Sequence, residues 1–227
     1  MVTVISLGGS IVAPDKVDEN FLKDFTALIA EILIDDKERR FIFVVGGGGP
    51  ARTWQQAYRS VAAGGSDAEA DWIGVMATRL NAQLVKAVMS EWCPQDVVID
   101  PTQAAPMEGR VLVAAGWKPG FSSDNDAVLL AERFKADTVI NLSNIEQVYT
   151  DDPRKNPAAK PIAKISWKDF RAMVGDEWVP GKNVPFDPVA SRRASELGLK
   201  VICAAGRNLD NLKKLLCGEA FLGTVIG

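Results

Sequence analysis

The chain of 227 residues carries 26 Lys and Arg against 29 Asp and Glu, and 47% of its residues are hydrophobic. This balance is ordinary for a globular protein and creates no overall attraction to nucleic acid or an anionic membrane, so neither partner is expected. The chain has no histidine, which excludes mechanisms that need an imidazole base, nucleophile or metal ligand. Chemistry that depends on positioning, charge and magnesium remains, and phosphoryl transfer is the leading case.

Membrane insertion, secretion and disulfide bonding are not expected either. The sequence has no run of about 18 apolar residues, and its start lacks the basic flank of a signal peptide. The three cysteines, Cys93, Cys203 and Cys217, are odd in number and widely spaced. We therefore expect reduced, mostly buried thiols in a cytoplasmic protein.

Strand-like runs alternate with helix-like runs along the whole chain. Strands are expected over 2–7, 41–45, 97–99, 111–113, 138–142, 200–205 and 223–226. Helices are expected over 19–33, 50–62, 67–92, 124–134, 167–174, 188–197 and 209–216, with the third broken near Gly74, and 149–161 is expected to be a polar loop. The alternation predicts one α/β domain over 1–227, a three-layer α/β/α sandwich with a mostly parallel central sheet.

Two glycine clusters each follow a predicted strand. Gly8-Gly9-Ser10 follows the strand 2–7, and the segment 46–49 follows the strand 41–45. Glycine after a buried strand allows positive φ and lets backbone N–H groups turn toward an anion such as a phosphate. One such loop is as often a simple tight turn, but two of them predict a site for more than one phosphate. Neither cluster fits the P-loop or the G-x-G-x-x-G fingerprint.

Three charged residues follow these clusters. Arg52 lies about one helical turn past the second cluster, where a guanidinium can bind a phosphate through two hydrogen bonds. A solvated Arg on a helix surface is the alternative. Asp71 is suited to accept hydrogen bonds from a ribose or base, and Arg79 to bind a phosphate. An N-cap Asp and a surface Arg are the alternative for this pair.

The turn-rich segment 116–126 runs into a predicted helix start. Its hydroxyls and backbone N–H groups could surround a ligand, and Lys118 supplies a positive charge. Ser123 or Asp124 is expected to cap the helix. A plain connector between a strand and a helix is the alternative.

Two later loops also carry candidate ligand groups. After the strand 138–142, Tyr149 is placed to stack on a base and Asp152 to accept from a ribose hydroxyl, although a solvated turn would look similar. In the segment 181–188, Asp187 could organise Lys182 or a metal-bound phosphate. Taken alone, Asp187 is more simply explained as an N-cap before Pro188.

Taken in order, these segments resemble the amino acid kinase family, and within it the uridylate (UMP) kinases of the archaeal type. The resemblance covers nearly the whole chain. The segments that carry it are 8–10, 46–52, 71–74, 79–82, 119–124, 148–153, 186–188 and 223–224.

The resemblance implies transfer of the γ-phosphoryl group of ATP to UMP by a homohexamer built from dimers. The acceptor part would be about 1–120 and the ATP part about 121–227, with Mg²⁺ carried by the ATP phosphates and no metal ligand from the protein. The catalytic residues it implies are Arg52, Asp187 and Lys182. The ATP-binding residues it implies are Gly9, Ser10, Gly48, Arg52, Ser143, Tyr149 and Asp152. The UMP-binding residues it implies are Gly47, Asp71, Arg79, Trp117, Lys118, Pro119, Gly120, Phe121, Ser122 and Ser123.

The chain departs from the family pattern at two places. Many members carry a Lys two residues before the first Gly-Gly pair, and this chain has Ser6 there. Another cation must then share its role, and Lys182 and Lys118 are the candidates. Trp117 and Phe121, like Lys118, stand where small residues and His are expected. Two other interpretations therefore stay open: a kinase of the same fold with a non-nucleotide acceptor, and a non-catalytic nucleotide-binding or storage protein.

Overall fold

Strands and helices alternate in the computed structural model, which describes residues 2–177 and 184–227. The strands are β1 (Val2–Leu7), β2 (Arg40–Val45), β3 (Val111–Ala114), β4 (Thr138–Ser143), β5 (Val148–Tyr149), β6 (Pro161–Ile162), β7 (Lys164–Ile165), β8 (Lys200–Ala205) and β9 (Thr224–Ile226). The helices are α1 (Gly9–Val12), α2 (Glu19–Asp35), α3 (Gly48–Val61), α4 (Asp67–Val88), α5 (Ser123–Arg133), α6 (Trp167–Val174), α7 (Pro188–Glu196) and α8 (Leu209–Leu216).

Seven strands form the main sheet in the order β3-β2-β1-β4-β8-β9-β7. The first five run parallel, and in register Ile5 of β1 lies between Phe43 of β2 and Ile140 of β4. β9 runs antiparallel to its neighbour β8, and β7 pairs parallel with β9. The prediction of a mostly parallel sheet is confirmed.

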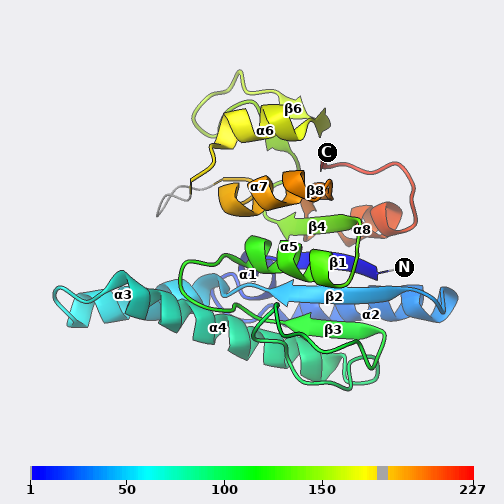
Figure 1. Ribbon diagram of the computed structural model, residues 1–227, viewed down its shortest axis with the longest axis horizontal. Coiled ribbons are helices and arrows are strands. Elements are labelled where there is room, and N and C mark those ends of the chain that lie inside the picture. Colours follow the sequence, from blue (N-terminus) through cyan, green and yellow to red (C-terminus); the bar gives the residue numbers. More distant parts are fainter. Residues whose placement is uncertain (1, 178–183) are drawn as a thin grey trace.

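Helices cover both faces of this sheet (Figure 1). Successive side chains of β2 belong to opposite cores: Phe41 and Phe43 pack with α1, α2, α4 and α8, whereas Ile42 and Val44 pack with α5, α6 and α7. This alternation is what a strand buried on both faces requires. The three-layer α/β/α sandwich predicted from the sequence is therefore confirmed.

The predicted break in the helix 67–92 is wrong. α4 continues from Asp67 through Gly74 to Val88. A Cβ at Gly74 would lie 2.6 Å from Nε2 of Gln55 on α3, so this glycine permits close packing of α3 against α4. Glycine lowers helix propensity, but packing between helices outweighs that cost here.

Two shorter elements also differ from expectation. The predicted strand 97–99 is reduced to a single bridge between Val98 and Ala114. The predicted loop 149–161 has its two ends paired, because β5 and β6 form a small antiparallel sheet in which Tyr149 lies opposite Pro161. Tyr149 therefore lies in a strand.

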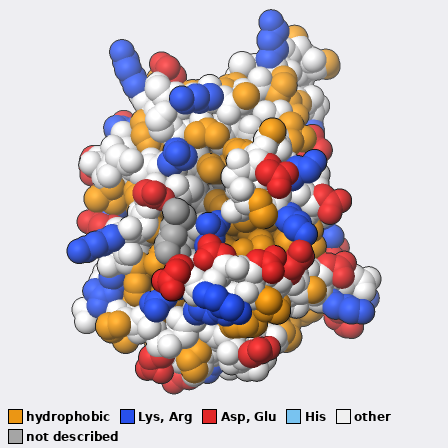
Figure 2. Space-filling view, turned by 90° about the vertical axis from the view of Figure 1, so that its right-hand side faces the viewer, with side chains coloured by type: hydrophobic (Ala, Val, Ile, Leu, Met, Phe, Trp, Pro, Cys, Tyr) orange, Lys and Arg blue, Asp and Glu red, His pale blue; other side chains and the backbone are white. Residues whose placement is uncertain are grey.

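The carboxyl ends of β1 and β2 point toward the side where α3 projects beyond the sheet (Figure 1). Both glycine clusters lie at this edge, where ligands of parallel sheets bind. Figure 2 views the other edge, near the amino end of the chain, where acidic and basic side chains are interspersed. Among the described residues, no helix is both long and apolar enough to cross a membrane. Cys93 and Cys203 are buried and Cys217 is exposed, and all three are free thiols.

Candidate active site

The two glycine clusters contact each other because β1 and β2 are adjacent parallel strands. A Cβ on Gly9 would overlap the amide nitrogen of Gly48, and a Cβ on Gly46 would overlap that of Gly9. Gly48 also has a φ of +65°, which favours glycine. The amides of Gly8, Gly46 and Gly49 donate to nearby backbone carbonyls. These three N–H groups are thus not turned toward an anion, and the glycines here also serve close packing.

A cavity of about 260 Å³ opens beside the second glycine cluster. Its lining is Gly46, Gly47, Gly48, Ala51, Gln55, Asp71, Gly74, Val75, Thr78, Gly116, Lys118, Pro119, Gly120, Phe121, Ser122 and Ser123. Nine of the predicted ligand residues therefore meet there, although they come from separate parts of the chain. Among the described lining residues, Asp71 and Lys118 are the ones that carry charge.

Asp71 faces the loop that closes this cavity. Its Oδ2 accepts a hydrogen bond from the amide of Gly120 at 3.2 Å. The alternative that Asp71 is an N-cap is wrong, because Ser66 caps α4 by accepting from the amide of Glu69. Asp71 instead lies inside the helix with its carboxylate directed at residues 116–122.

Three more hydrogen bonds hold this segment, which we call the 116–122 loop. The Gly116 amide donates to Oγ1 of Thr78 at 2.8 Å. The Trp117 amide donates to Oδ2 of Asp126 at 3.1 Å, and the Trp117 carbonyl accepts from Nη2 of Arg79 at 3.1 Å. Arg79 thus binds backbone and supports the loop from behind the cavity; neither it nor Trp117 lines the cavity.

The side chains of the 116–122 loop form a small aromatic cluster around a cation. The rings of Trp117 and Phe121 meet edge to face with centroids 4.7 Å apart. Nζ of Lys118 lies 3.8 Å from the Trp117 centroid and 5.0 Å from that of Phe121. Cation–π contacts with two rings favour a defined position for this ammonium group.

Asp124 joins three elements next to the glycine clusters. Its Oδ1 accepts from the Ser6 hydroxyl of β1 at 3.0 Å, and its Oδ2 accepts from the amide of Asp187 at 3.2 Å. Desolvation raises the pKa of Asp124 to about 6, with the neighbouring Asp187 adding to the shift. The helix cap expected at Ser123 or Asp124 is instead Ser122.

Asp187 is the N-cap of α7, as the simpler interpretation predicted. Its Oδ1 accepts from the amide of Ala190 at 2.8 Å, and the residue is 6% exposed. Its place beside Asp124 puts two carboxylates near the end of β1. From its sequence position, Asp124 is expected only as a helix cap. The position of Ser6 two residues before Gly8-Gly9 was the available signal for its hydrogen bond to Asp124.

Asp126 is the second residue that sequence reasoning missed. It is fully buried, and within residues 2–177 and 184–227 its Oδ1 has no hydrogen-bond partner. Desolvation raises the pKa of Asp126 to about 7, and the nearby charges of Asp100 and Asp124 add to the shift. A carboxylate directly before the apolar run 127–131 was the only sign of it in the sequence.

Arg52 lies on the exposed side of α3, away from the cavity lining. Its Nη2 donates to the carbonyl of Pro14 at 2.9 Å. The structure thus places this predicted catalytic residue beside the segment that follows α1. Lys182, the other predicted catalytic cation, lies outside the described residues.

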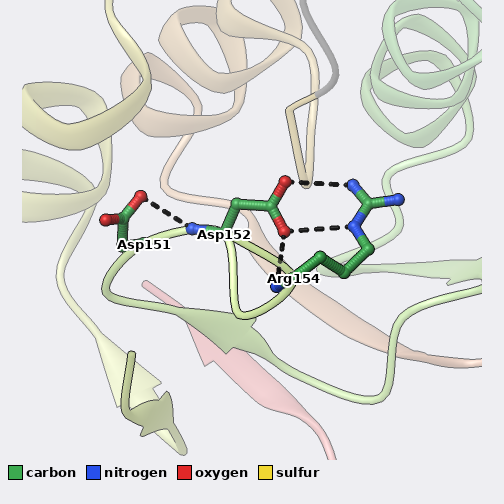
Figure 3. Close-up of polar contacts among 3 residues, drawn as sticks. All are labelled: Asp151, Asp152 and Arg154. Atoms are coloured by element: carbon green, nitrogen blue, oxygen red, sulfur yellow. Dashed lines mark hydrogen bonds and ion pairs between the residues drawn. The ribbon is translucent and has the colours of Figure 1, made fainter. Parts of the chain in front are cut away.

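The residues predicted to bind the nucleoside of ATP lie at the end of β4 and after it, apart from the cavity. Ser143 ends β4, and its Oγ accepts from the amide of Ile145 at 3.4 Å. Asp152 faces Arg154, whose Nε and Nη2 donate to its two oxygens at 3.1 and 3.2 Å (Figure 3). These hydrogen bonds lower the pKa of Asp152. Its carboxylate is therefore partnered by a residue two positions away.

The described residues offer no ready-made metal centre. Within 2–177 and 184–227, no group of three or more Cys, Asp or Glu is arranged to hold an ion. Asp124 and Asp187 together supply only two carboxyl groups at the end of β1. Magnesium with few protein ligands is common where phosphates and water complete its octahedron.

Comparisons with known proteins converge on one family. A model described as "Amino acid kinase family" matches residues 1–205. The uridylate kinase of Methanospirillum hungatei is 36% identical over 226 residues, covering 98% of this chain and 93% of the relative. That of Thermoplasma volcanium is 34% identical, covering 98% and 96%. The crystal structure of uridylate kinase from Archaeoglobus fulgidus has a TM-score of 0.84 and 32% identity, with both chains covered fully.

Proposed function

Because the chain belongs to the amino acid kinase family, we propose that it is an ATP-dependent UMP kinase that converts ATP and UMP to ADP and UDP. The observation that carries this proposal is the cavity at the carboxyl ends of β1 and β2, lined by the second glycine cluster, Asp71 and the 116–122 loop. The relatives named uridylate kinase, which match nearly the whole chain, support it.

In this proposal UMP occupies the cavity. Asp71 accepts hydrogen bonds from the nucleoside, Lys118 faces an anionic group, and the aromatic ring of Phe121 packs against the base. ATP lies on the other side of the glycine clusters, along the segment that follows β4, near Ser143 and Tyr149. The acceptor part is then about 1–120 and the ATP part about 121–227.

Phosphoryl transfer of this kind depends on alignment and charge stabilisation. A UMP phosphate oxygen attacks the γ-phosphorus in line, and no side-chain base is needed. Backbone N–H groups near Gly9 and Gly48, together with Arg52 and Lys182, stabilise charge on the transferred group. Magnesium, when bound to the ATP phosphates, would neutralise part of the same charge. Asp187 holds the start of α7 and orders the groups around it.

We also propose that the chain forms a homo-oligomer. The family resemblance implies a hexamer built from dimers. A row of exposed apolar side chains four or eight residues apart on α4 supports the homo-oligomer: Trp72, Met76, Leu80 and Val88 are between 40% and 72% exposed. Residues at this spacing share one side of a helix and suit burial against another copy. Leu80→Glu should lower the mass measured by light scattering, and an unchanged mass would remove this face from the assembly.

The assay that tests the activity follows ADP production from ATP and Mg²⁺ with UMP, CMP, dUMP, AMP or no acceptor. Turnover with UMP above the no-acceptor rate supports the proposal. Turnover only when a carboxylate, carbamate or phosphonate is supplied in place of the nucleotide would favour another kinase of this fold. ATP binding without turnover of any acceptor would favour a binding protein, the interpretation that Ser6 motivates.

A further inference from the structure

The backbone of Trp117 is held from two sides by charged side chains. Asp126 of α5 accepts from its N–H, and Arg79 of α4 donates to its C=O. The next residue is Lys118, whose ammonium group lies over the Trp117 ring and lines the cavity. The orientations of the two peptide groups that flank the Trp117 Cα therefore set where the cation of the cavity wall lies.

The surroundings of Asp126 disfavour its ionised form. Within the described residues, its Oδ2 has the Trp117 amide as a partner and its Oδ1 has none. The charged groups that face it are Asp100, from the segment after α4, and Asp124, from its own helix, and both are acidic. The Arg79 guanidinium binds the Trp117 carbonyl, which belongs to the following peptide group. A buried carboxylate without a cation costs more than a neutral side chain of the same shape.

We infer that Asp126 is a positioning residue for the acceptor nucleotide: its ionised carboxylate fixes the Trp117 amide and so holds Lys118 and Phe121 in place at the cavity wall. The inference rests on the proposed function, since it names UMP as the acceptor. Asp126 does not line the cavity itself, so it acts through the loop and leaves the transferred group untouched.

A dependence on pH follows from this geometry. A carboxylate accepts a stronger hydrogen bond from an N–H group than a neutral carboxyl does. Since burial raises the pKa of Asp126 to about 7, protonation weakens the anchor as the pH falls through that value. We expect the KM for UMP to rise about fivefold between pH 8.5 and pH 6, with a much smaller change in the KM for ATP.

The test compares wild type with Asp126→Asn, which is neutral at every pH and keeps an oxygen acceptor for the Trp117 amide. The KM of the variant for UMP, divided by that of wild type, should be about 5 at pH 8.5 and about 1 at pH 6. The UMP phosphate also titrates near pH 6, but this affects both proteins equally and cancels in the ratio. Glu132→Gln on the same helix is the matched control, because Glu132 is partly exposed and pairs with Arg193.

The variant is expected to fold. The raised pKa of Asp126 means that the folded state binds more protons than the unfolded state between pH 3.8 and about 7. Wild-type stability therefore falls as the pH rises through this window. Asp126→Asn removes that slope and should unfold at a higher temperature than wild type at pH 8.

Two results would overturn the inference. One is a variant whose KM for UMP equals that of wild type at every pH. The other is a variant that loses kcat and raises both KM values by the same factor at every pH. If wild type turns over no UMP at any pH, the proposed function fails and the inference about UMP fails with it. If wild type turns over UMP and Asp126→Asn has the same KM for UMP, the inference fails and the proposed function stands.

Discussion

The 116–122 loop connects β3 to α5 and the segment 150–159 connects β5 to β6, and the two are held in different ways. The first is bound by side chains far away in sequence: Asp71 and Arg79 on α4, and Asp126 on α5. The second is bound mainly by its own members, through the pairs Asp152–Arg154 and Asp151–Asn156.

The difference teaches which half of the site is formed in advance. Contacts to two packed helices fix a loop without a ligand, because loop and helices must unfold together to break them. Bonds between near neighbours on a surface leave the segment as a whole free to shift. We expect the acceptor cavity to be preorganised and the ATP-side segment to gain order when nucleotide binds.

The largest expected effect concerns Arg52, which is proposed to stabilise the transferred phosphoryl group. Arg52→Ala should lower kcat about 10³-fold, the loss typical of removing an arginine that stabilises the transferred phosphoryl group, while the fold persists because Arg52 is exposed. Arg59→Ala is the control, since Arg59 lies on the same helix and pairs with Asp67 across 3.7 Å. Near wild-type turnover would exclude Arg52 from catalysis and leave its bond to Pro14 as its role.

A smaller effect is expected at the preorganised loop. Asp71→Ala removes the acceptor of the Gly120 amide and should raise the KM for UMP about tenfold, with little change in the KM for ATP. Asp67→Ala on the same helix is the matched control, because the Asp67 side chain is 95% exposed. Equal changes in both KM values would contradict the assignment of this loop to the acceptor.

The smallest effect is expected in the self-paired segment. Arg154→Ala frees the Asp152 carboxylate, and the KM for ATP should change by no more than about threefold, because exposed ion pairs contribute little. The Arg154 side chain is 78% exposed, so stability should not change measurably. A tenfold change in the KM for ATP would mean that this segment is as well ordered before binding as the 116–122 loop.

The sequence predicted well whatever depends on local pattern. The strand 2–7 follows from a short apolar run, and the capping role of Asp187 follows from residue chemistry at a helix start. The Gly74 prediction failed because the packing partner, Gln55, is brought close only by the tertiary fold. Asp124 and Asp126 were missed as site residues for the same reason, since their partners Ser6 and Trp117 meet them only across packed elements.

Amide hydrogen exchange of the full chain, alone and with UMP or ATP, tests the central claim most directly. The account predicts that, without ligand, the amides of Gly116, Trp117 and Gly120 exchange more slowly than those of residues 152–159. UMP should then slow exchange in 71–80 and 116–122, whereas ATP should slow it mainly in 143–159. Fast exchange in the free 116–122 loop, or no response of that loop to UMP, would contradict a preorganised UMP site.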